Sequence, residues 1–134
     1  MTRIGEREWP TQRRVVNLFA DELGYAYLGN LGEQHNENIL VDELEHFLRA
    51  YQGYAEREDG EVLVKRAIHE LQTTSGNTSW SLYDRNKAVY GLLRYGIKVK
   101  AGAGELTQTV WPIDWAQPER NRFAIAEEVR VDPT

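Results

Sequence analysis

One carboxylate near the end of the sequence stands among apolar residues. The stretch FAIAEEVRVDPT, residues 123–134, has the alternation of a β-strand. Because successive side chains of a strand point to opposite faces, Glu127 shares its face with apolar residues only. These are Phe123, Ile125, Val129 and Val131. A carboxylate in such a row costs free energy unless it is paired, hydrogen-bonded or bound to a cation. Two interpretations stay open: Glu127 belongs to a metal site or polar cluster, or a β-bulge at Glu127 and Glu128 turns both acids outward.

Other patterns with known chemistry are incomplete in this sequence. The segment HELQT, which begins at His69, has Thr73 where a zinc-binding helix needs its second histidine. The three histidines, His35, His46 and His69, are not at ligand spacing. Gly102 and Gly104 form a lone G-x-G with no helix after it, which favours a hairpin turn over a phosphate loop. The absence of cysteine excludes thiol catalysis and Cys-based metal sites.

Charge is distributed unevenly along the 134 residues. Residues 33–61 hold nine acids against two basic residues, a net charge of −7, whereas residues 85–100 hold five basic residues and no acid. The overall charge of −5 weighs against a protein that binds duplex DNA through bulk electrostatics, but the basic segment permits a local phosphate-facing patch. The candidates for contact with a DNA backbone are Arg94, Lys98 and Lys100. The alternative is a solvated basic face.

Helices dominate the first two thirds of the chain, and strands follow. Apolar spacing and end signals predict helices at residues 10–23, 39–51, 60–72 and 81–95. Strands are predicted at residues 25–29, 97–100, 106–111 and from 123 on. In the last helix Ser81 and Asp84 match a capping box, and Gly96 is the expected terminator. This order predicts one α+β domain, or α/β with a mixed sheet, over residues 1–134.

Composition indicates a folded protein away from membranes. Hydrophobic residues make up 41% of the chain, which argues against disorder. No apolar run approaches the ~18 residues that span a bilayer, and the N-terminus lacks the apolar core of a signal peptide. We therefore expect a cytoplasmic protein without a membrane partner.

Three ordered blocks resemble the N-terminal region of the R subunit of type I restriction endonucleases. They are TQRRVVNLFADELGYAYLGN, SLYDRNKAVYGLLRYGIKVKAGAGE and TVWPIDWAQPERNRFAIAEEVRV. The resemblance runs from Thr11 to Val131 and implies a nuclease domain followed by ATP-driven motor domains. It also implies methylation and specificity subunits as partners on foreign DNA. Within the second block we expect Tyr83, Asn86 and Tyr90 to fix helix packing.

The nuclease of the family that this chain resembles has a PD-(D/E)xK-like fold. In that fold an Asp and a Glu-x-Lys on successive strands hold Mg²⁺ and the attacking water. The sequence contains no Glu-x-Lys, and Asp114 belongs to the turn before the closing strand. We therefore expect an incomplete nuclease domain, cut before its catalytic strands, that supplies scaffold and is inactive alone. Glu127, and Glu22 on the first helix, are the candidates for an additional acid. Mg²⁺ and ATP would belong to the whole subunit.

A second interpretation assigns the chain to a non-enzymatic class of protein. The chain would be a non-enzymatic α+β interaction module of natural length that shares the scaffold without its chemistry.

Overall fold

The structure is a computed structural model that describes the backbone of residues 4–32 and 39–129 and the side chains of residues 9–32 and 39–129. Its contacts group the chain into two compact units, which we call the terminal unit and the central unit. The terminal unit consists of Met1–Glu37 and Arg122–Pro133, and the central unit of Asn38–Asn121. The expectation of a single domain over the whole chain stays a prediction.

The terminal unit begins with helix α1, Ile4–Asn17, which continues as a π-helical turn over Leu18–Glu22. The prediction that this helix starts at Pro10 is wrong, because α1 passes through Pro10. Proline favours a first turn since it lacks an N–H and crowds the preceding turn, but it does not always end a helix. Gly24 ends the helical region with a φ of +75°, as its position predicted.

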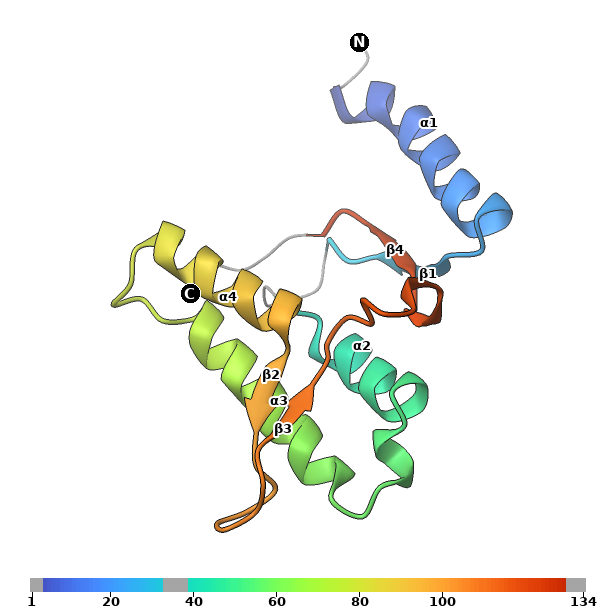
Figure 1. The fold of residues 1–134 in the computed structure, drawn as a ribbon. Coiled ribbons are helices and arrows are strands. Elements are labelled where there is room, and N and C mark those ends of the chain that lie inside the picture. Colours follow the sequence, from blue (N-terminus) through green and yellow to red (C-terminus); the bar gives the residue numbers. More distant parts are fainter. Residues whose placement is uncertain (1–3, 33–38, 130–134) are drawn as a thin grey trace. The chain divides into compact units, whose positions relative to one another are not determined.

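The described part of the terminal unit also contains a pair of parallel strands (Figure 1). Strand β1, Ala26–Asn30, pairs in parallel with β4, Ala124–Glu127, although nearly a hundred residues separate them in the chain. Tyr25, which precedes β1, packs against the residue before β4 and against the π-helical turn. Its ring contacts Phe123 and Phe19 at centroid distances of 5.3 and 5.0 Å, respectively. The sequence predicted both strands but not their parallel pairing.

The central unit contains three α-helices and one hairpin (Figure 1). Its helices are α2, Val41–His46, extended by a π-helical turn over Phe47–Tyr51; α3, Gly60–Ser75; and α4, Leu82–Tyr95. Short 3₁₀ turns cover Tyr54–Glu56 and Pro118–Arg120. Strands β2, Ile97–Val99, and β3, Gln108–Val110, pair antiparallel, so the predicted hairpin is confirmed. Helices with a small antiparallel and a small parallel sheet make the chain a mixed helix-and-strand protein.

The hydrophobic core of the central unit forms around α3. One face of this helix is buried, and it consists of Leu63, Val64, Ala67, Ile68 and Leu71. These residues pack with Leu48 from the π-helical turn, Ile97 from β2 and Val110 from β3. Val62, the apolar residue before this face, is exposed. A stripe at spacings of three and four on α3 therefore supplies half of the ten buried residues of this core.

Helix α4 begins and ends where its sequence signals indicated. The Ser81 hydroxyl accepts a hydrogen bond from the backbone N–H of Asp84 at 3.1 Å, which caps the helix. Gly96 follows the last turn with φ +86° and ψ 161°, a conformation that a residue with a side chain rarely adopts. However, Tyr83, Asn86 and Tyr90 are exposed, so the structure does not give them the packing role that we expected.

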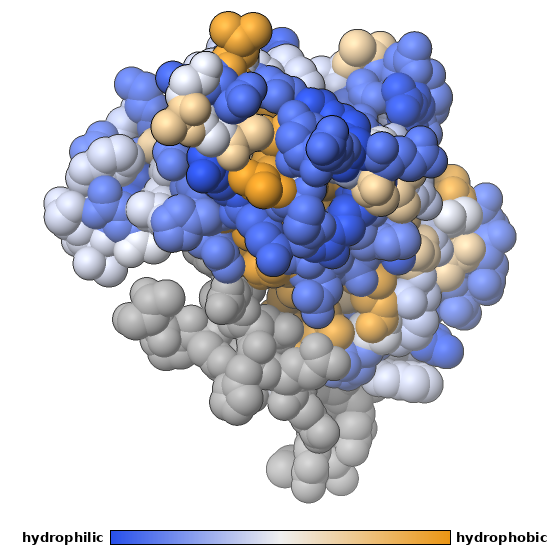
Figure 2. All heavy atoms as spheres, turned by 90° about the horizontal axis from the view of Figure 1, so that it is seen from below, coloured by the Kyte–Doolittle hydropathy of each residue, from blue (hydrophilic) through white to orange (hydrophobic). Residues whose placement is uncertain are grey.

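Hydrophobic side chains that remain exposed form separate small patches among hydrophilic residues on the face shown in Figure 2. Among the described residues, no helix has the length and apolar content needed to cross a membrane.

Candidate functional site

Glu127 is the buried carboxylate of the terminal unit, with 8% of its surface exposed. Its Oε1 accepts hydrogen bonds from the Tyr27 hydroxyl at 2.6 Å and from Arg13 at 3.4 Å. Its Oε2 accepts one from the Gln12 side-chain amide at 2.9 Å. We call these four residues the Glu127 cluster. The polar-cluster interpretation of Glu127 is therefore confirmed.

Three elements meet in the Glu127 cluster. Gln12 and Arg13 come from α1, Tyr27 from β1 and Glu127 from the end of β4. The backbone strengthens the same junction, because the N–H of Leu31 donates to the Glu127 carbonyl at 2.9 Å. One buried side chain thus connects the helix to both strands of the parallel pair.

The predicted bulge lies in a different strand. Tyr27 pairs with Ile125, and Asn30 pairs with Glu127. Between these two pairs β1 advances by three residues and β4 by two, so β1 contains one extra residue. The extra residue of β1 is accommodated at Gly29, which has a φ of +86° and no side chain to obstruct it. The prediction of a bulge that turns both acids outward is wrong for Glu127. Glu128 alone is exposed, with a φ of +53°.

Hydrogen bonds within the Glu127 cluster shift the pKa values of Glu127 and Tyr27. The pKa of Glu127 is lowered from its ordinary 4.5, mainly by the hydrogen bond from Tyr27 and also by Gln12 and the Arg13 charge, which outweigh the opposing effect of burial. The same bond, which needs the Tyr27 proton, raises the pKa of Tyr27. Glu127 is therefore a carboxylate at neutral pH, and Tyr27 is a neutral phenol.

Acid should weaken the terminal unit through this carboxylate. A group whose pKa is lower in the folded state stabilises the fold above its unfolded pKa, and this contribution is lost as pH falls through the folded value. We expect the free energy of unfolding to decrease as pH drops below 4.5, the ordinary glutamate value, in part because Glu127 takes up a proton. Urea unfolding at several pH values measures this effect.

The Glu127→Gln variant should lose that part of the pH dependence, and the Glu128→Gln variant should retain it, because Glu128 is exposed. Identical pH profiles for the wild type and Glu127→Gln would contradict the assignment.

The described residues offer no prepared metal centre. They contain no group of three or more histidine, aspartate or glutamate side chains arranged to hold a metal ion. Both Glu127 oxygens face hydrogen-bond donors, and Arg13 balances the charge, so the cluster does not suit a cation. Glu22 is exposed in the π-helical turn and is not among the residues bonded to Glu127. The cluster therefore has a structural role, since it holds α1 against β1 and β4.

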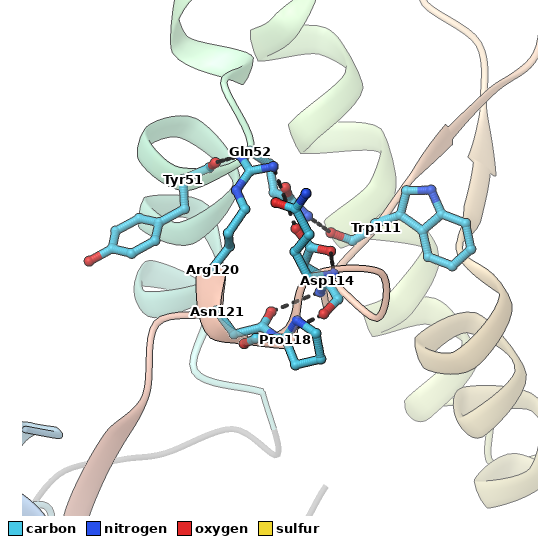
Figure 3. Close-up of polar contacts among 8 residues, drawn as sticks. Tyr51, Gln52, Trp111, Asp114, Pro118, Arg120 and Asn121 are labelled. Atoms are coloured by element: carbon cyan, nitrogen blue, oxygen red, sulfur yellow. Dashed lines mark hydrogen bonds and ion pairs between the residues drawn. The ribbon is translucent and has the colours of Figure 1, made fainter. Parts of the chain in front are cut away.

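Asp114 has a structural role in the loop that follows β3 (Figure 3). Its carboxylate accepts a hydrogen bond from the Gln117 N–H at 2.9 Å and lies 3.7 Å from Arg120. Its backbone N–H and carbonyl both bond to the Asn121 side chain, at 2.8 and 3.0 Å. Arg120 in turn donates to the Tyr51 carbonyl at 3.1 Å. These bonds fix the loop.

The loop builds a pocket of about 330 Å³ with the end of α4. The residues around it are Gln52, Arg94, Trp111, Asp114, Trp115 and Ala116. The Arg94 guanidinium lies 5.1 Å from the centre of the Trp115 ring, and the Lys98 ammonium lies 5.9 Å from that of Trp111. Both distances are within the range of cation–π attraction. We call Arg94, Lys98, Trp111 and Trp115 the aromatic–basic surface.

Of the three predicted DNA-contact residues, Arg94 and Lys98 thus lie over tryptophan rings of the same surface. Lys100 lies further along the hairpin, where its carbonyl accepts a hydrogen bond from Arg66 at 2.7 Å. Sequence reasoning missed the tryptophans, although their four-residue spacing in TVWPIDW was a visible signal beside a basic segment. It also missed Gln12, Arg13 and Tyr27, for which no local signal exists.

Comparison with known proteins links these features to one family. The family described as type I restriction enzyme R protein N terminus matches residues 6–134. Searches among curated proteins and among solved structures gave no significant match. The match includes α1 from its third residue, the Glu127 cluster and the aromatic–basic surface. By this match over almost its whole length, the chain belongs to the family of type I restriction enzyme R protein N termini.

Proposed function

We propose that this chain supplies scaffold and a DNA contact to the nuclease of a type I restriction enzyme R protein, which cuts unmodified foreign DNA with Mg²⁺ and ATP. The observation that carries the proposal is the Glu127 cluster within a chain of this family. A buried, fully bonded carboxylate at the end of a strand supports a framework role better than a catalytic one. The PD-(D/E)xK-like fold of the complete nuclease is part of the proposal.

The framework role follows from what the Glu127 cluster holds together. Among the described residues, the sheet of β1 and β4 has two strands, and an isolated pair is marginally stable without further packing. Few apolar residues of the terminal unit are buried among those described, namely Val16 and Leu31. Bonds from Gln12, Arg13 and Tyr27 to one carboxylate therefore have a large share in fixing α1 against the strands. Catalytic residues that depend on β4 for their position would depend on this junction.

The described residues of this chain do not suit Mg²⁺. The described residues hold no cluster of metal ligands, and the sequence has no Glu-x-Lys. We assign Mg²⁺ to catalytic residues and ATP to motor domains of the R protein, outside this chain. Methylation and specificity subunits are the partners that this role requires.

The proposed DNA contact is made by Arg94 and Lys98. Both are exposed, both come from the basic segment, and both lie against the tryptophans of the aromatic–basic surface. Neither has an acidic partner among the salt bridges of the described residues. The Lys98 ammonium donates hydrogen bonds to the Tyr95 carbonyl and the Thr109 hydroxyl, which leave its charge without a carboxylate partner. Both charges can therefore attract phosphate groups, and an overall charge of −5 limits binding elsewhere on the chain.

The salt dependence of DNA binding tests this contact. Each phosphate contact that is lost should reduce the slope of log K against log salt by about 0.9. We therefore expect the double variant Arg94→Gln/Lys98→Gln to bind duplex DNA more weakly, with a slope smaller by about 1.8. Fluorescence anisotropy of a labelled duplex over a range of salt concentrations gives both quantities.

The matched control is Lys65→Gln, which removes an exposed charge that faces Glu61 on α3. It should leave affinity and slope unchanged. A double variant with the wild-type slope would exclude Arg94 and Lys98 as phosphate contacts.

A further inference from the structure

The pocket of the aromatic–basic surface has features that phosphate contact does not require. Trp111 and Trp115 are 40% and 45% exposed, although tryptophan usually buries most of its large apolar surface. A cavity of about 330 Å³ lies beside them, with an arginine at its edge. This volume is at the lower end of the range for small-molecule sites, which suits one planar group and not an extended ligand.

The Trp115 side chain is held in place before any ligand arrives. Its indole N–H donates to the Leu93 carbonyl at 2.8 Å, which attaches the ring to the last turn of α4. The Arg94 guanidinium, from the same turn, lies over that ring. A ring fixed in this way loses little conformational freedom on binding, which favours affinity.

Gly96 leaves room for Thr109 beside the second tryptophan. A Cβ at this position would overlap the Thr109 side-chain methyl and would lie 3.4 Å from the Trp111 ring. The missing side chain therefore makes room for Thr109 of β3, two positions before Trp111, and a Cβ would touch the Trp111 ring only at an ordinary contact distance.

The polar groups of the pocket are engaged within the protein. The Gln52 amide donates to the Trp111 carbonyl at 3.2 Å, and the Asp114 carboxylate is bonded to Gln117 and faces Arg120. Figure 3 shows these bonds on the loop, with the Trp111 side chain directed away from Asp114. The pocket thus offers aromatic faces and positive charge, whereas the side chains of Gln52 and Asp114 already have partners. Such a site recognises the flat face of a ligand and a nearby anion.

We propose that this pocket binds an unpaired base of single-stranded DNA, which stacks on Trp115 and Arg94 while Lys98 meets a neighbouring phosphate. Bases stack on aromatic rings and on guanidinium planes, and stacking is tolerant of sequence. Charge complementarity selects this occupant, because a nucleotide carries both the planar group and the phosphate. The inference rests on the proposed DNA contact and adds an unpaired base as the ligand.

The decisive comparison is between a 12-nucleotide oligothymidylate and an abasic strand of the same length, which carries the same phosphates without bases. We expect the wild-type chain to bind the oligothymidylate about tenfold more tightly, in line with measured base–aromatic stacking. Trp115→Ala should remove this difference, and Trp115→Phe should keep part of it. Anisotropy of end-labelled strands measures the affinities.

Trp80 provides a matched control, because it is 46% exposed, like Trp115, but is not among the residues that line the pocket. Trp80→Ala should preserve the preference for the strand with bases. Tryptophan quenching by the oligothymidylate, measured in a Trp9→Phe/Trp80→Phe background, should come from the two tryptophans of the pocket.

Equal affinity of the wild type for the two strands would overturn the inference, and this comparison does not depend on the folding of any variant. Tighter binding of a proline-rich peptide than of the oligothymidylate would assign the pocket to a polypeptide and would also overturn it. If base preference is absent but Arg94→Gln/Lys98→Gln weakens duplex binding, the pocket proposal fails while the phosphate contact stands. If neither effect appears, both proposals fail.

Discussion

Replacing Leu63 with Ala should lower the free energy of unfolding of the central unit by about 2–5 kcal/mol. Leu63 has no exposed surface and lies on the buried face of α3, in the core shared with Leu48, Ile97 and Val110. The loss combines the transfer free energy of the removed atoms with the cavity they leave, because close-packed surroundings collapse only partly. Urea unfolding followed by circular dichroism measures the change.

Val62 is the matched control for this prediction, since it precedes Leu63 on the same helix and is 42% exposed. Val62→Ala should change the free energy of unfolding by only about 0.5 kcal/mol, as is usual for surface substitutions. Equal losses for the two variants would mean that α3 does not bury the face described.

Elements of the central unit were largely predictable because their signals are local. The capping residue Ser81, the terminator Gly96 and the apolar spacing of α3 each act within a few residues, and the structure follows them. The β2–β3 hairpin was predictable for the same reason, since Gly102 and Gly104 lie in the turn between its strands.

The terminal unit was less predictable because its contacts are distant in sequence. Nothing near Glu127 indicates that its partners are Gln12 and Arg13, which lie 115 and 114 positions earlier. The parallel pairing of β4 with β1 is equally non-local, and the extra residue of β1 depends on Gly29. The apolar row did identify Glu127 as a residue that needs partners.

For the candidate site, the basic charge was predictable from the sequence but its surroundings were not. Arg94 and Lys98 were candidates, yet their place over Trp115 and Trp111 depends on the loop that Asp114 organises. Lys100 shared the same charge signal and lies elsewhere on the hairpin. Charge counting cannot separate these cases, because it contains no information on packing.

Glu127→Gln should reduce DNA cleavage by the R protein that carries this chain about ten- to a hundredfold, since misplacement by about 1 Å can cost a hundredfold in rate. The substitution keeps the size of the side chain but removes the charge that faces Arg13. It also places an amide N–H₂ among the donors from Gln12 and Tyr27, which can no longer all find acceptors. The junction of α1, β1 and β4 should loosen.

The matched control is Glu128→Gln, which changes an exposed neighbour that lies outside the Glu127 cluster. It should leave cleavage unchanged. ATP hydrolysis should be the same in the wild type and both variants, because the proposed motor domains do not depend on the cluster.

The most direct test of the scaffold role is the ratio of DNA cleavage to ATP hydrolysis, measured for the R protein assembled with its partner subunits, Mg²⁺ and ATP. We predict that Glu127→Gln lowers this ratio about ten- to a hundredfold while Glu128→Gln preserves it. A Glu127→Gln enzyme that cleaves DNA at the wild-type ratio would contradict the proposal that the Glu127 cluster supports the nuclease.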